Sequence, residues 1–134
     1  ISSLRSPHDQ NLNILLVEDN PINQQVSKLM LGKLNYKVTL AEDGQHALDI
    51  LQNVPEGHFS LVLMDCQMPV MDGFDATRAI RSGQAGTKHQ DLTIIALTAN
   101  AMDEDKEQCL ASGMDDYLAK PIQLQTLKDK LEQY

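Results

Sequence analysis

The strongest constraint on the fold of this chain is a set of short apolar runs that do not alternate with polar residues. They lie at 13–17, 61–64 and 93–97. Apolar runs of about four or five residues are typical of strands that are covered on both faces, as in a parallel sheet. Such a sheet needs helices on both faces, and a chain of 134 residues is long enough to supply them around a core.

Acidic residues follow two of these runs directly. Glu18 and Asp19 come after the first run, and Asp65 comes after the run at 61–64. Ligand sites of open α/β sheets lie outside the carboxyl ends of the strands, so the three carboxylates converge if the two strands are neighbours. Carboxylates that lie so close together cannot all ionise without a counter-charge. We therefore expect a divalent metal there, with Lys120 as a second cation.

Strand and helix patterns alternate five times along the chain. The expected strands lie at 13–17, 37–41, 60–64, 93–97 and 116–119. Asn20, Asp43 and Asp72 are expected to begin the helices after the first three strands, and Gly113 to end the fourth helix. Regular alternation predicts an α/β fold with parallel strands and right-handed crossovers. Five such units favour the flavodoxin-like doubly wound sheet with strand order 2-1-3-4-5, which places the first strand beside the third.

Composition excludes several classes of function. The net charge of −8 argues against binding to nucleic acid or to an anionic membrane. No apolar run approaches the roughly 20 residues that cross a bilayer. Cys66 and Cys109 have no ligand spacing, so we expect reduced thiols in the core of a cytosolic domain. The four histidines show no metal-ligand spacing, and we assign them no role.

The ends and loops of the chain are polar. Residues 1–12 show no periodicity and are expected to be a linker or a fragment edge. The folded domain is then expected at 13–134, as one piece of a longer polypeptide. A further polar stretch, 82–90, is expected to be a surface loop.

The chemistry that the strand ends can perform follows from their side chains. Carboxylates, the hydroxyl of Thr98 and the ammonium of Lys120 are expected at one edge of the sheet. Oxygen ligands with open positions suit Mg²⁺. A carboxylate can also act as a nucleophile and form an acyl phosphate. Phosphoryl transfer requires positioning and neutralisation of the phosphoryl oxygens, which these groups and backbone N–H groups together provide.

Four motifs in this order carry a resemblance to a known family. They are Ile14–Asn20, Met64–Gly73, Ala96–Asn100 and Tyr117–Pro121. Over about residues 13–132 the chain resembles a receiver domain of a two-component response regulator. The resemblance implies that Asp65 is the phosphoacceptor. Spacing alone leaves Asp19 as an alternative nucleophile.

The resemblance also implies roles for the surrounding residues. Asp19, Asp65 and the main-chain carbonyl of Gln67 would ligate Mg²⁺ (or Mn²⁺), and Glu18 would hold a metal-bound water. Lys120 would contact the acyl phosphate.

A switch is implied by the same resemblance. Thr98 would be the switch hydroxyl, and Tyr117 would rotate into the space that Thr98 leaves. The surface formed by the last helices and strands would change as a result.

Details of the motifs are most similar to receivers of hybrid sensor histidine kinases. The expected partner is a histidine-phosphotransfer domain or a histidine kinase domain. The expected docking surface is the start of the first helix, at Ile22, Asn23 and Val26, although Val26 also fits a core position. The domain is expected in the cytoplasm, in a parent protein that could be anchored in the inner or plasma membrane.

Simpler interpretations remain open for each residue taken alone. Asp19 could cap a helix, Asp65 could start a turn, and Lys120 could lie in a surface turn. Two other classes of protein are also considered. A haloacid-dehalogenase-like phosphatase would need a second aspartate two residues after its nucleophile, and a flavodoxin-like binding module would need a Ser/Thr/Gly-rich loop after the first strand. Neither pattern is present.

Overall fold

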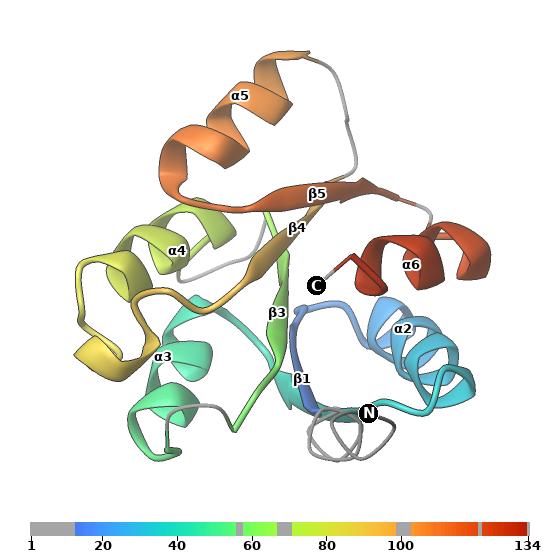
Figure 1. Cartoon of the computed structure of the whole chain (residues 1–134), viewed down its shortest axis with the longest axis horizontal. Helices are drawn as coiled ribbons and strands as arrows, with labels where there is room; N and C mark the ends of the chain where they lie inside the picture. The colour runs from blue at the N-terminus through green and yellow to red at the C-terminus, as the bar shows by residue number, and fades with distance from the viewer. Residues whose placement is uncertain (1–12, 56–57, 67–70, 99–102, 121, 134) are drawn as a thin grey trace, which may run out of the picture.

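A computed structural model describes most of the chain. The described residues are 13–55, 58–66, 71–98, 103–120 and 122–133. Within them, five strands form one parallel sheet in the order β2-β1-β3-β4-β5 (Figure 1). The strands are β1 (Asn13–Val17), β2 (Lys37–Ala41), β3 (Leu61–Asp65), β4 (Ile94–Thr98) and β5 (Asp116–Ala119). This is the flavodoxin-like order expected from the sequence.

Helices cover both faces of the sheet. They are α2 (Pro21–Lys33), α3 (Gly44–Gln52), α4 (Gly73–Arg81), α5 (Asp103–Ser112) and α6 (Leu124–Leu131), with a short 3₁₀ helix, η1 (Thr87–His89). In Figure 1, α2 and α6 lie on one side of the sheet and α3, α4 and α5 on the other. The helix that follows β1, α2, therefore lies on the opposite face of the sheet from α3 and α4, which follow β2 and β3.

Two cores lie on the two faces of the sheet. Successive side chains on a strand point to opposite faces. Val62 and Met64 of β3 accordingly pack on the face covered by α3, α4 and α5. Leu61 and Leu63 pack on the face covered by α2 and α6. Burial on both faces explains why the strand sequences are continuously apolar.

Side-chain caps fix where the helices begin. The Oδ1 of Asn20 accepts hydrogen bonds from the backbone N–H groups of Ile22 and Asn23, at 2.9 and 3.2 Å. Asp43 and Asp72 cap α3 and α4 in the same way. These caps were expected from the sequence, and they set the first residues of the helices that follow β1, β2 and β3.

Asp65 and Thr98 lie at the ends of their strands, as expected. β3 is Leu61–Asp65 and β4 is Ile94–Thr98, so each of these residues is the last one of its strand. The ladder continues through these polar residues because Asp65 pairs with Leu97 and the N–H of Cys66 donates to the Leu97 carbonyl at 3.1 Å. The strands thus hold the two side chains more rigidly than a loop would.

The expected surface loop at 82–90 is only partly exposed. Residues 87–89 form η1, and Ala85 and His89 are buried. The Nε2 atom of His89 lies 3.2 Å from the carbonyl oxygen of Val54. The expectation was wrong for these residues because a short polar stretch gives no periodicity that would reveal which side chains turn inward.

Gly73, the first residue of α4, is pressed against the strand that carries Asp65. A Cβ atom added to Gly73 would lie 2.2 Å from the Asp65 carbonyl oxygen and 3.0 Å from the Cys66 Cα. Gly32 in α2 has nothing within 4 Å of the same position. We expect Gly73→Ala to lower the free energy of unfolding by about 1–3 kcal/mol, because backbone must move to accept the methyl group.

The matched control is Gly32→Ala, which should raise stability by about 0.5–1 kcal/mol. Urea unfolding of both variants measures the difference. Equal stabilities for the two variants would show that the close approach of α4 to β3 is not present in solution.

Candidate functional site

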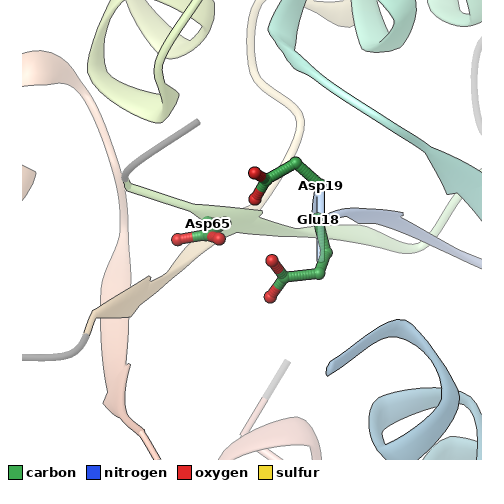
Figure 2. A group of neighbouring side chains, drawn as sticks. All are labelled: Glu18, Asp19 and Asp65. Atoms are coloured by element: carbon green, nitrogen blue, oxygen red, sulfur yellow. The ribbon is translucent and has the colours of Figure 1, made fainter. Parts of the chain in front are cut away.

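Three carboxylates meet at the carboxyl end of the sheet. Glu18 and Asp19 follow β1, Asp65 ends β3, and these two strands are neighbours. One oxygen from each carboxylate lies within 4.8 Å of the others. Figure 2 shows the three carboxyl groups turned toward a common space. The convergence expected from the sequence is confirmed, whereas the separate role of each residue stays a prediction.

The three acids differ in their exposure. Glu18 is 1% exposed and Asp65 is also buried, whereas Asp19 lies at the surface. The N–H of Glu18 extends the ladder by donating to the Ala41 carbonyl at 3.0 Å. Its Oε2 accepts a hydrogen bond from the N–H of Asn20 at 3.2 Å. Glu18 is therefore held at the inner side of the site and Asp19 at the outer side.

Lys120 supplies the counter-charge that the acids require. Its Nζ lies 3.1 Å from Glu18 Oε1 and 3.1 Å from Asp65 Oδ2. Lys120 directly follows β5, and its N–H donates to the Thr98 carbonyl at 2.7 Å, which extends the pairing of β4 with β5. The side chain then reaches past β4 to β3 and the end of β1, and joins four strand ends in one cluster.

Burial and neighbouring charge shift two pKa values in the site. The pKa of Glu18 rises from 4.5 to about 7, chiefly because burial disfavours the carboxylate, and also because Asp65 lies beside it. Lys120 and the N–H of Asn20 oppose this rise. Burial on its own would lower the pKa of Lys120, but the hydrogen bonds and charges of Asp65 and Glu18 outweigh it and raise the pKa overall. Lys120 is therefore charged at neutral pH, and Glu18 is close to its midpoint.

The donor set fits a hard divalent cation. Fully ionised, the three carboxylates carry three negative charges, and Lys120 balances one of them. Carboxylate oxygens are the ligands that Mg²⁺ prefers, usually with several waters. The exposed Asp19 leaves one side of the group accessible to such waters. Gln67, whose carbonyl was expected to be a ligand, lies outside the described residues.

The two residues expected to form a switch lie on adjacent strands. Thr98 ends β4 and pairs with Ala119 of β5. Tyr117 of β5 is partly buried and packs against the core under α3, α4 and α5. Lys130 of α6 places its Nζ 5.9 Å from the centre of the Tyr117 ring. The placement is consistent with the expected pair, and the switch itself stays a prediction.

The expected docking residues lie at the start of α2. Ile22 is 73% exposed, Val26 is exposed and Asn23 is half-buried. The core interpretation of Val26 was wrong, because α2 buries Ser27 and Leu31 against the sheet. Leu29 is also exposed and was not expected in this patch. Its signal in the sequence is the spacing of 22, 26 and 29, which places all three side chains on one face of a helix.

A shallow cavity joins this patch to the acidic site. Its volume is about 150 Å³. Its lining contains Glu18, Lys120, three residues of α2 and one residue that precedes α6, namely Asn23, Val26, Ser27 and Ile122. A group that entered from the exposed face of α2 would thus arrive beside the acids and Lys120.

Comparison with known proteins shows the family. Residues 14–132 match the family model of the response regulator receiver domain, which is most of the chain. The chain therefore belongs to the response regulator receiver domain family. The haloacid-dehalogenase-like alternative has no support from these comparisons.

The relatives include sensor kinases and solved receiver domains. The chain is 41% identical to the sensor histidine kinase RcsC of Escherichia coli over 126 residues, covering 94% of this chain and 12% of RcsC. The receiver domain of a Pseudomonas aeruginosa sensor histidine kinase, crystallised with a magnesium ion coordinated in its active-site cleft, is 45% identical with a TM-score of 0.82. The match covers 92% of this chain and 97% of that one.

A third similar structure is a complex. The receiver domain of the Saccharomyces cerevisiae response regulator Ssk1, crystallised with the histidine phosphotransfer protein Ypd1, is 37% identical with a TM-score of 0.80. The match covers 92% of this chain and 88% of that one. The chain spans only 6% to 16% of the length of its first curated relatives. Among the described residues, no helix has the length and apolar character needed to cross a membrane.

The raised pKa of Glu18 predicts how stability depends on pH without divalent metal. Glu18 titrates near 7 in the folded chain and near 4.5 when unfolded, so folding favours the protonated form. Its stabilising contribution is complete below pH 4.5 and is lost as the pH rises through about 7. We expect the free energy of unfolding in chelator to fall by on the order of 2–3 kcal/mol over this range.

Glu18→Gln is the matched control, because it keeps the shape of the side chain but does not titrate. Urea unfolding across the pH range should show the fall in the wild type relative to this variant. Parallel pH profiles for the two proteins would contradict the assignment of a raised pKa to Glu18.

Proposed function

We propose that Asp65 accepts a phosphoryl group from a phosphohistidine, in a Mg²⁺-dependent (or Mn²⁺-dependent) reaction, and that the domain relays this signal in a two-component phosphorelay. The observation that carries the proposal is the contact of Lys120 Nζ with Asp65 Oδ2 at 3.1 Å, inside a group of three carboxylates. A buried carboxylate that shares an ammonium with a second acid is suited to receive a charged group and to have that charge balanced.

In the proposed reaction, a carboxylate oxygen of Asp65 attacks the phosphorus atom. An oxygen–phosphorus bond forms, the phosphorus–nitrogen bond breaks, and its electron pair returns to the imidazole of the donor. Lys120 already contacts the carboxylate and would neutralise an oxygen of the arriving phosphoryl group. Asp19 and Asp65, with Glu18 behind them, would hold Mg²⁺. When bound, the metal supplies further positive charge to the phosphoryl oxygens.

Position distinguishes Asp65 from Asp19 as the nucleophile. Asp65 ends β3, the central strand of the sheet, and is in contact with Lys120. Asp19 lies at the surface at the start of the turn into α2. The Pseudomonas aeruginosa receiver, with magnesium in its active-site cleft, supports a metal role for the acidic group as a whole.

The proposed switch involves β4, the strand that lies between β3 and β5 in the sheet. Phosphorylation adds about −1.5 to −2 charge and strong acceptor oxygens at Asp65. Thr98 on the neighbouring β4 would move to donate to one of them, and Tyr117 would turn into the space left behind. The surface formed by the last helices and strands, including α5 and β5, would then favour a second state.

The proposed donor is a histidine-phosphotransfer domain or a histidine kinase domain. The co-crystal of the Ssk1 receiver with Ypd1 supports this class of partner. The exposed side chains of Ile22, Val26 and Leu29 offer an apolar surface, and the cavity beside them leads to Lys120 and Glu18. The parent is proposed to be a hybrid sensor histidine kinase with this domain, 13–134, facing the cytoplasm after a linker at 1–12, and it could be anchored in a membrane.

The first test concerns the nucleophile. Incubation with a phosphorylated histidine-phosphotransfer protein and Mg²⁺ should add one phosphoryl group that hydroxylamine removes, as intact-protein mass spectrometry detects. Asp65→Asn should abolish this labelling, because the amide is not a nucleophile. Asp19→Asn is the matched variant. It should raise the Mg²⁺ concentration that labelling requires, while the label still maps to Asp65. Labelling that survives in Asp65→Asn would refute the proposal.

A second test concerns the docking surface. Ile22→Asp should slow phosphotransfer from the protein donor at least about fivefold, because an interface anchor typically contributes over 1 kcal/mol. It should leave labelling by acetyl phosphate unchanged, since that donor needs no docking. Leu110→Asp is the control, as Leu110 is 54% exposed on α5. Equal rates for the two variants with the protein donor would place the docking surface elsewhere.

A further inference from the structure

Two buried cysteines lie in contact beside the acidic site. The Sγ atoms of Cys66 and Cys109 are 3.8 Å apart, although the residues are 43 positions apart in the chain. Both are thiols in the structure, and both belong to the core on the face of α3, α4 and α5. A disulfide bond requires a sulfur separation of about 2.05 Å. The two sulfur atoms would therefore need to approach by less than about 2 Å to form a disulfide bond.

The two cysteines belong to different elements. Cys66 directly follows Asp65, the last residue of β3. Its N–H donates to the Leu97 carbonyl at 3.1 Å and its carbonyl accepts from the N–H of Gly73 at 3.2 Å, so both sides of its backbone are held. Cys109 lies in the last turns of α5, and its carbonyl accepts from the Ser112 hydroxyl at 2.8 Å. The sulfur atoms can approach by rotation of the side chains or by a small movement of α5.

We propose that Cys66 and Cys109 form a redox-sensitive pair that a peroxide converts into an intramolecular disulfide. Cys66 is 6% exposed and Cys109 is fully buried, so Cys66 is the thiol that a small oxidant reaches. Its sulfur attacks a peroxide oxygen, the oxygen–oxygen bond breaks, and a sulfenic acid and one water form. The Cys109 sulfur then displaces the hydroxyl as a second water. The two thiols lose two electrons and two protons, and the peroxide gains them.

The geometry favours the second step over further oxidation of Cys66. The partner thiol is already in van der Waals contact, so ring closure is an intramolecular reaction with a high effective concentration. Burial restricts access of a second oxidant molecule to the sulfenic acid. The product is a core disulfide that thiol reductants reverse only slowly in the folded state.

The disulfide would tie α5 to the strand end that carries Asp65. In the reduced structure α5 is held by packing against α4 and β5. A covalent link to Cys66 adds an attachment directly after the end of β3, which is separated from β5 by β4. Oxidation would therefore restrict movement of α5. Any effect on signalling rests on the proposed function, in which α5 is part of the responding surface, but formation of the disulfide does not.

The test treats the folded, reduced chain with hydrogen peroxide and needs no phosphodonor, so its result is independent of the proposed function. We expect a loss of two hydrogens in the intact mass, a cross-linked peptide that joins Cys66 to Cys109, and full reversal by reductant after unfolding. Amide hydrogen exchange in α5 should slow at least about tenfold, and the Tm should rise by several degrees, as closing a long loop predicts.

Cys66→Ala and Cys109→Ala are the matched controls, and neither should show the mass loss or the change in exchange. Treatment of the wild type in urea shows whether native contact matters, since the cross-link should form faster in the folded chain. Three results would overturn the proposal: a sulfinic acid on Cys66 without a cross-link, a disulfide between two chains, or a cross-link that forms only in urea.

Discussion

The contact of one ammonium group with two buried carboxylates is the interaction on which the rest of the site depends. Lys120 lies 102 positions from Glu18 in the sequence, yet its Nζ is 3.1 Å from that carboxylate and from Asp65. Removing either charge from a buried pair leaves the other without compensation, which is unfavourable. The carboxyl ends of β1 and β3 and the chain after β5 are therefore held together by charge as well as by the sheet. The same excess of negative charge that strains this cluster fits it for a divalent cation and a phosphoryl group.

The helices beside the cluster pack closely against the end of β3. The start of α4 touches the backbone of Asp65 and Cys66 so closely that Gly73 has no room for a side chain. Cys66 in turn touches Cys109 of α5. The residue that is proposed to carry the phosphoryl group thus has α4 against its own backbone and α5 against the residue that follows it. Close packing of this kind holds a reacting group in a productive geometry, and it also lets a change at Asp65 alter the packing of these helices.

Much of the fold could be predicted from the sequence because the local signals agree with one another. Continuous apolar runs such as 13–17 indicate strands buried on both faces, and Asn20, Asp43 and Asp72 cap helices as their positions suggest. Regular alternation then leaves few topologies. Asp65 and Thr98 end their strands as expected, since backbone pairing does not require an apolar side chain. An error arose where the signal was weak. His89 is buried within a polar stretch.

By itself, the sequence determined the order of the strands, the end of the sheet at which Glu18, Asp19, Asp65 and Lys120 would gather, and the family to which the motifs belong. It could do so because strand and helix periodicities and capping residues are local. Only the tertiary structure decided that Lys120 pairs with both Glu18 and Asp65, that Val26 faces solvent, and that two cysteines touch. These contacts and exposures depend on how side chains from distant segments pack and how their charges interact. The spacing of residues along the chain does not give the distances between such side chains.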